Sequence, residues 1–343
     1  MRAPGFWWRP KPGALARLLQ PLGLLYGAAT LARMRRPGLD IGIPVICVGN
    51  FVAGGAGKTP TALALCALLA GRGQTPFILS RGYGGRLAGP IEVDPARHGA
   101  TDVGDEPLLM ARAMRTIVAR DRPAGAALAR SLGASVVVMD DGLQNPSLAK
   151  SLKLAVVDGA GGAGNGLCLP AGPLRAPLAG QFALTDAVIL IGEGTAGERV
   201  AAAARMHDLP VLRARLDPPP ALREALRGRR VVAVSGIGRP EKFTATLRDA
   251  GADIVAERIF ADHHAYTAAD VSDLLAQAKA SDSLVATTEK DATKLVPLWP
   301  GGEAARLLVV PVTLSFEQPE RVTRLLGAVS GKACSGTLGA PQP

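Results

Sequence analysis

Short runs of consecutive apolar residues alternate along this chain with longer segments in which apolar residues recur every three or four positions. A short apolar run is typical of a strand buried on both faces, and the wider spacing is typical of a helix with one buried face. The runs lie at 43–50, 76–79, 135–139, 230–236, 254–260, 284–288 and 307–314, and the helical patterns at 61–71, 108–114, 240–250 and 267–280. This alternation predicts an α/β fold with a parallel sheet.

The chain has 343 residues, which is more than one typical domain contains. Its proline-rich segment 216–220 is predicted to be a linker. The linker would separate a larger α/β domain at 37–215 from a second, smaller α/β domain at 221–330. Residues 1–36 are expected to form an N-terminal interfacial helix, and residues 331–343 a flexible tail.

The N-terminal segment carries most of the net charge. No acidic residue precedes Asp40, whereas seven of the ten units of net charge come from basic residues before it: Arg2, Arg9, Lys11, Arg17, Arg33, Arg35 and Arg36. An uncharged stretch at 18–32 lies between these arginines, with Trp7 and Trp8 upstream. The basic character of the protein is therefore local.

Three interpretations of this segment are open: a helix in the membrane interface, a helix packed on the body of the protein, and a signal peptide or membrane span. The stretch is shorter than the roughly 20 apolar residues that a span needs, and Pro21, Gly23 and Gly27 weaken it further. We favour the interface, because arginines suit lipid phosphates and tryptophans suit the headgroup level.

The composition excludes several classes of protein. Cys47, Cys66, Cys168 and Cys334 are scattered with no CxxC pair, which excludes a disulfide scaffold and a cysteine-based zinc site. Beyond the N-terminal segment the charges nearly balance, and aromatic residues make up only 4% of the chain. A nucleic-acid platform would need basic stripes with stacking rings, so no nucleic-acid partner is expected.

The strongest motif is a glycine-rich turn between a predicted strand and a predicted helix. Gly54, Gly55, Ala56 and Gly57 precede Lys58 and Thr59 in the form GGAGKT. Backbone amides of such a turn surround phosphate oxygens, the lysine reaches the β- and γ-phosphates, and the threonine hydroxyl binds Mg²⁺. Val52 stands where the strict pattern has its first glycine. The turn nevertheless predicts that 37–215 is a P-loop NTPase-like domain that binds ATP with Mg²⁺.

An acid at the end of a neighbouring strand is expected beside such a turn. Asp140 and Asp141 follow the apolar run 135–139 directly. Because ligands bind at the carboxyl ends of strands in α/β sheets, Asp140 is predicted to hold Mg²⁺ directly or through water. Asp141 would serve either the metal or the start of the next helix.

Other segments concentrate polar residues beside predicted strands and helices, and each has an ordinary structural interpretation as well. Arg81 and Tyr83, in SRGYGG, face either a substrate or a simple turn. Asp105 and Glu106, in GDEP, either stabilise a helix start or supply a general base near the γ-phosphate. The remaining segments are Asp262-His263-His264, the rigid LPAGPLR that ends at Arg175, and the Lys290-Asp291 pair in TEKDA.

Taken together, these segments resemble one family, the tetraacyldisaccharide 4'-kinases of lipid A biosynthesis. The matching stretches are VGNFVAGGAGKTP, SRGYGG, GDEP, DDGLQ, GNG followed by LPAGPLR, SGIG, DHH, and TEKDA followed by Lys294, and they extend from about residue 15 to 325. The resemblance implies transfer of the ATP γ-phosphate to the 4'-hydroxyl of an acylated glucosamine disaccharide 1-phosphate. It also implies a peripheral enzyme on the cytoplasmic face of the inner membrane, with no obligate protein partner.

The resemblance also assigns roles to residues. Asp105 matches the catalytic base and His263 the histidine paired with it. Glu106, Asp140 and Asp141 match acids around the metal. Lys58, Lys290 and Asp291 would contact nucleotide, and Arg81, Tyr83, Arg122 and Arg175 the substrate.

Two positions depart from the family pattern: Asn145 replaces a histidine, and Ala176 replaces a glutamate. Neither residue titrates, so any role that a titratable side chain has at these two positions in the family is not filled by Asn145 or Ala176 in this chain. The competing hypothesis is a membrane-recruited P-loop ATPase that acts as a switch or positioning protein. Ala53 stands where the partitioning-type ATPases carry a second lysine, which argues against that class.

Overall fold

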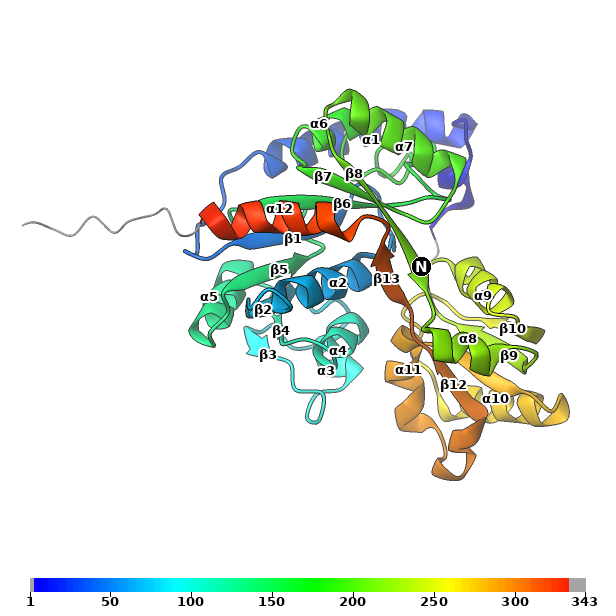
Figure 1. Cartoon of the computed structure of the whole chain (residues 1–343). Helices are drawn as coiled ribbons and strands as arrows, with labels where there is room; N and C mark the ends of the chain where they lie inside the picture. The colour runs from blue at the N-terminus through cyan, green and yellow to red at the C-terminus, as the bar shows by residue number, and fades with distance from the viewer. Residues whose placement is uncertain (1–2, 333–343) are drawn as a thin grey trace, which may run out of the picture.

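The computed structural model describes residues 3–332 and confirms the α/β fold (Figure 1). Its larger sheet contains β1 (Val45–Asn50), β2 (Pro76–Ser80), β3 (Ile91–Glu92), β4 (Thr116–Val118), β5 (Val136–Asp140), β6 (Leu152–Asp158), β7 (Ala187–Ile191), β8 (Val211–Asp217) and β13 (Thr313–Phe316). The strand order is β13-β8-β7-β6-β1-β5-β2-β4-β3, and only the edge strands β3 and β13 pair antiparallel. The order reverses around β1, and ligands of such sheets bind at the carboxyl ends of the strands next to the reversal.

Helices cover both faces of this sheet. One face is covered by α2 (Lys58–Ala70), α4 (Asp105–Ala111) and α12 (Pro319–Lys332), and the other by α1 (Ala14–Met34), α5 (Arg122–Ser131), α6 (Leu178–Phe182) and α7 (Thr195–Met206); the short η1 (Gly5–Trp8) and α3 (Ala100–Val103) complete the domain. Alternate residues of β5 enter different cores: Val136 and Val138 face α2, whereas Val137 and Met139 face α5. This explains why the run is apolar throughout.

The second domain is a smaller parallel sheet, at the lower right in Figure 1. Its strands are β9 (Arg230–Ser235), β10 (Asp253–Ile259), β11 (Leu284–Thr288) and β12 (Leu307–Val310), in the order β10-β9-β11-β12. Its helices are α8 (Pro220–Leu226), α9 (Pro240–Asp249), α10 (Ala268–Ala280) and α11 (Glu289–Leu295), with the short η2 (Val296–Leu298) and η3 (Gly301–Arg306). The helices pack on two separate apolar clusters, one on each face of the sheet.

The predicted domain boundaries were wrong at three places. The second domain does not extend to residue 330, because β13 pairs with β8 of the larger sheet and α12 packs into the core of the first domain. The second domain is therefore inserted into the first. The linker predicted at 216–220 consists of only two residues, Pro218 and Pro219, between β8 and α8. The predicted tail begins inside α12, and residues 333–343 lie outside the described part of the chain.

Helix α1 separates its small residues from its large ones. Ala16, Gly23, Gly27 and Thr30 are buried, and a side chain at Gly23 or Gly27 would collide with Cys168. The opposite side exposes Leu15, Leu18, Leu22, Leu24, Leu25 and Tyr26. Among the described residues, no helix is both long and apolar enough to cross a bilayer. The helix thus docks through its small face and presents leucines outward.

Candidate active site

The glycine-rich turn joins the central strand to a helix. It follows β1, and α2 begins at Lys58. Gly54 and Gly57 have φ angles of 105° and 92°, which side chains rarely tolerate, and a side chain at Gly57 would lie 2.7 Å from Ile191 Cδ1. The Nζ atom of Lys58 lies 3.4 Å from the Gly54 carbonyl and 3.7 Å from Asp141 Oδ1. The turn therefore has the backbone freedom and the cation that phosphate binding needs.

Two consecutive carboxylates, Asp140 at the end of β5 and Asp141 directly after it, lie in different environments. Asp140 is buried, and its Oδ1 has no hydrogen-bond partner within the described protein. Burial, together with the charges of Glu106 and Asp141, raises the pKa of Asp140 to about 7. Asp141 accepts two hydrogen bonds from Arg175, at 3.0 and 3.1 Å. Asp140 is therefore the carboxylate left free for a ligand.

A pair of side chains from different domains forms the second half of the site. His263 Nδ1 lies 3.0 Å from Asp105 Oδ2, and Lys290 Nζ lies 3.3 Å from His263 Nε2. Because an ammonium group only donates, Nε2 accepts and the proton is on Nδ1, which donates to Asp105. His263 has a φ of 59°, an uncommon conformation for a residue with a side chain and one that occurs at functional sites.

Lysines surround this pair. Lys294 Nζ lies 3.2 Å from Asp105 Oδ2, and Lys290 Nζ lies 3.2 Å from both Glu106 Oε1 and Asp262 Oδ1. Burial raises the pKa of Asp105, but the hydrogen bond from His263 and the charges of Lys290 and Lys294 outweigh it and hold this pKa well below its usual range. Asp105 is consequently ionised at neutral pH and can only accept a proton.

Some of the predicted substrate residues lie at the site, whereas others form hydrogen bonds to groups within this protein. The Tyr83 ring lies 5.3 Å from the His263 ring and is largely exposed, and Arg81 is exposed beside it in sequence. Arg122 is buried and donates to the carbonyls of Leu79 and Asp140, at 3.0 and 3.2 Å. It therefore supports the end of β5 from within the protein.

Two further predicted residues have clear partners within the protein. Besides Asp141, Arg175 donates to the Val52 carbonyl and to Gln144. Asp291 is fully buried, and its Oδ2 accepts the Gly236 amide at 2.9 Å and the Thr288 hydroxyl at 2.7 Å. Asp291 fixes a turn of the second domain, whereas the neighbouring Lys290 reaches across to the first.

Lys294 was included in a matching stretch of the sequence but was assigned no role there. It lies four residues after Lys290 on α11, so both lysines share one helix face, and this spacing was the available signal. At the positions that depart from the family pattern, Asn145 accepts the Ser147 amide at 2.8 Å and Ala176 is fully buried. Neither residue supplies a titratable group.

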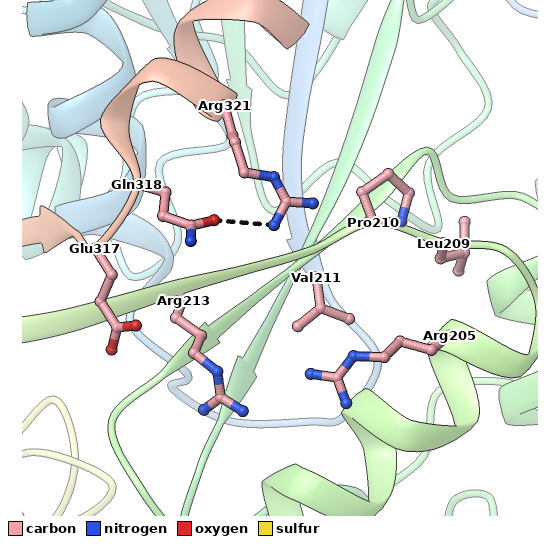
Figure 2. Close-up of a pocket in the computed structure, with 8 residues that line it drawn as sticks. All are labelled: Arg205, Leu209, Pro210, Val211, Arg213, Glu317, Gln318 and Arg321. Atoms are coloured by element: carbon pink, nitrogen blue, oxygen red, sulfur yellow. Dashed lines mark hydrogen bonds between the residues drawn. The ribbon is translucent and has the colours of Figure 1, made fainter.

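A separate cavity of about 290 Å³ lies between α7, β8 and α12 (Figure 2). It is lined by Arg205, Leu209, Pro210, Val211, Arg213, Glu317, Gln318 and Arg321. Arg213 is held by Glu198 at 2.6 and 2.9 Å, and Arg321 donates to Gln318 at 3.0 Å. None of the lining residues belongs to the site described above.

A parallel sheet, a GGAGKT turn ahead of a helix and a buried acid on the next strand define a P-loop nucleotide-binding enzyme. The chain belongs to the tetraacyldisaccharide-1-P 4'-kinase family, whose model matches residues 15–330. The chain is thus a kinase, as the resemblance of its motifs indicated.

Individual relatives agree with this assignment. The chain is 58% identical over 320 residues to a tetraacyldisaccharide 4'-kinase of Methylobacterium nodulans, covering 93% of both chains. It is 52% identical over 341 residues to the enzyme of Rhodopseudomonas palustris, covering 97% of this chain and 98% of that one. A crystal structure of LpxK from Aquifex aeolicus, an "apo" form in complex with ATP, is similar with a TM-score of 0.69 and 25% identity, covering 92% of this chain and 99% of that one.

Proposed function

We propose that this enzyme transfers the γ-phosphate of ATP to the 4'-hydroxyl of a tetraacylated glucosamine disaccharide 1-phosphate, with Mg²⁺ as cofactor. The single observation that supports this best is the arrangement of the site. A phosphate-binding turn and Asp140 belong to one domain, and the Asp105–His263 pair joins that domain to the other. The family membership supplies the identity of the acceptor.

The GGAGKT turn would hold the triphosphate. Gly54, Gly55, Ala56 and Gly57 allow the backbone to approach the phosphate oxygens, and the start of α2 favours negative charge. Lys58 contacts Asp141 at 3.7 Å in the structure. In the nucleotide complex it would turn toward the γ-phosphate and stabilise the charge that develops there.

The residues near Asp140 fit a Mg²⁺ ion. A buried carboxylate oxygen without a hydrogen-bond partner, close to the charges of Glu106 and Asp141, is an oxygen ligand in need of a cation. No group of three or more His, Cys, Asp or Glu side chains is placed to hold a metal within residues 3–332. Phosphate oxygens, water and the Thr59 hydroxyl would therefore complete the coordination, and the ion would neutralise the phosphates.

Asp105 would accept the proton of the attacking hydroxyl, while His263 holds its carboxylate in place. Since the pKa of Asp105 is low, the carboxylate is a weak base. It would therefore take the proton late, after the hydroxyl oxygen has begun to bond to phosphorus and has become acidic. Lys290, which contacts Glu106 at 3.2 Å, would also contact the phosphates of bound ATP.

The acceptor would enter beside Tyr83, which is exposed next to His263, and near Arg81, which is exposed two residues earlier in the chain. Arg122 and Arg175 would act indirectly, by supporting the acids at the end of β5. The leucines exposed on α1, together with the flanking arginines, would hold the enzyme on the cytoplasmic face of the inner membrane as a peripheral protein. There the acylated acceptor would present its sugar at the headgroup plane.

The decisive experiment is a phosphate-transfer assay with γ-labelled ATP, Mg²⁺ and a tetraacylated disaccharide 1-phosphate in mixed micelles. The expected product is the labelled 1,4'-bisphosphate lipid. Omission of the acceptor tests the competing hypothesis of a switch ATPase. Hydrolysis of ATP at the full rate, with no labelled lipid when the acceptor is present, would refute the kinase proposal.

A further inference from the structure

A second set of contacts joins the two domains outside the catalytic pair. Asp158 ends β6, beside the strand that carries the P-loop, and its carboxylate is buried. Arg239 and Lys242, at the start of α9 in the second domain, each contact one of its two oxygens. The Gly161 amide donates to the same carboxylate at 3.0 Å. One buried anion of the first domain therefore holds two cations of the second.

The N-terminal segment reaches the same place. The Arg239 guanidinium lies 5.1 Å from the centre of the Trp8 ring, an arrangement that attracts a cation to the face of the ring. The adjacent Trp7 donates its indole N–H to the Pro170 carbonyl at 3.0 Å, and its own carbonyl accepts the Asn165 amide at 2.7 Å.

A short path leads from Arg239 to the catalytic histidine. Arg239 follows the turn after β9, three residues beyond Gly236. The Gly236 carbonyl accepts the His263 amide at 3.3 Å, and the Gly236 amide donates to Asp291 at 2.9 Å. A displacement of Arg239 away from Asp158 would therefore pull the backbone that carries His263.

We propose that Asp158, Arg239 and Lys242 position the second domain for phosphoryl transfer, and that Trp8 connects the N-terminal segment to this positioning. None of these residues touches the nucleotide turn or the Asp105–His263 pair. They act on catalysis through His263, whose hydrogen bond to Asp105 exists only while the domains hold this arrangement. The proposal rests on the phosphoryl transfer proposed above.

The first test is Asp158→Asn in the full-length enzyme. Misplacing a reacting group by about 1 Å can cost on the order of 100-fold in rate. We therefore expect kcat for the lipid acceptor to fall roughly 10- to 100-fold, with the KM for ATP changed less than about threefold, because the P-loop is untouched. Asp158→Glu should restore part of the rate. The matched control is Glu257→Gln, which breaks the 2.7 Å pair with Arg248 inside the second domain and should leave kcat unchanged.

The distinguishing measurement is the same substitution in a His263→Ala background. If Asp158 acts by placing His263, its loss should cost little more once the histidine is gone. An equal further loss in the His263→Ala enzyme would overturn the proposal, as would a wild-type kcat for Asp158→Asn. If Asp158→Asn does not fold, Arg239→Gln takes its place, since Lys242 then still pairs with the carboxylate.

Trp8→Ala tests the link to the N-terminal segment. We expect kcat to fall about threefold to tenfold, and this loss to disappear in the Arg239→Gln background. A full loss in both backgrounds would show that Trp8 acts elsewhere and would refute this part of the proposal. Absence of lipid phosphorylation by the wild-type enzyme would instead refute the proposed function, so the two failures are distinguishable.

Discussion

The exposed face of α1 allows a quantitative test of membrane binding. Leu18 and Leu25 lie seven residues apart on this face and are 77% and 70% exposed. Burying a whole leucine side chain contributes about 2 kcal/mol, so the exposed part of each contributes about 1.5 kcal/mol on insertion. Replacing both by serine should therefore cost about 3 kcal/mol, which is on the order of 100-fold in the partition coefficient.

The assay is co-sedimentation of the Leu18→Ser/Leu25→Ser enzyme with anionic vesicles, alongside KM for the acylated acceptor. Both binding and acceptor KM should worsen, while the KM for ATP and the free energy of unfolding stay nearly constant, because exposed side chains contribute little to folding. Val296→Ser is the control, since Val296 is 48% exposed but belongs to the second domain. Unchanged sedimentation of the double variant would refute the interface proposal.

These substitutions are cleaner than deletion of residues 1–36. The buried face of α1 lies against Cys168 through Gly23 and Gly27, so deletion would uncover part of the first domain. It would also remove Trp8 from Arg239. A truncated enzyme could thus lose activity for reasons that have nothing to do with lipid.

Three further predictions concern the site. Lys58→Ala should lower kcat by on the order of 10³-fold without unfolding the protein, and wild-type turnover would contradict the P-loop assignment. Asp105→Asn and His263→Ala should each lower kcat roughly 10²- to 10⁴-fold, with the double variant little worse than the poorer single one; multiplied losses would exclude a coupled pair. Because the pKa of Asp140 is raised to about 7, a proton competes with Mg²⁺ below that pH. Apparent affinity for Mg²⁺ and ATP, measured by calorimetry, should therefore strengthen as pH rises toward 7 and level off above it, whereas Asp140→Asn should show no such dependence.

Strands β1, β2 and β5 of the larger sheet and the four strands of the second domain were predicted from sequence because their signals are local, whereas β3, β4, β6, β7 and β8 were not predicted. The single run predicted at 307–314 is divided between β12 and β13. The run at 136–139 is apolar because both faces are buried, and Asp140 follows it directly. The pairing of β13 with β8 of the larger sheet could not be predicted from sequence. Residues 313–316 have the composition of a strand, but no local pattern says which of two sheets receives it, since that depends on pairing with β8, which lies about 100 residues earlier in the chain.

The roles of the arginines were also beyond sequence. Arg122 and Arg175 were predicted to meet substrate because the family resemblance assigns them there. Their actual partners are backbone carbonyls and Asp141, which come from segments distant in sequence. Likewise, sequence predicted an apolar N-terminal helix but could not tell that glycines, and not leucines, would face the protein.

The insertion of the second domain has a consequence for how the protein is made. Val322, Leu326 and Val329 of α12 belong to the same core as Leu65 of α2, although the ribosome adds them more than 250 residues later. The first domain must therefore wait, with this apolar surface uncovered, while residues 218–312 emerge and fold as a unit of local contacts. Because nascent chains with exposed cores aggregate, we expect this kinase to depend on chaperones that bind the growing chain until its last helix is released.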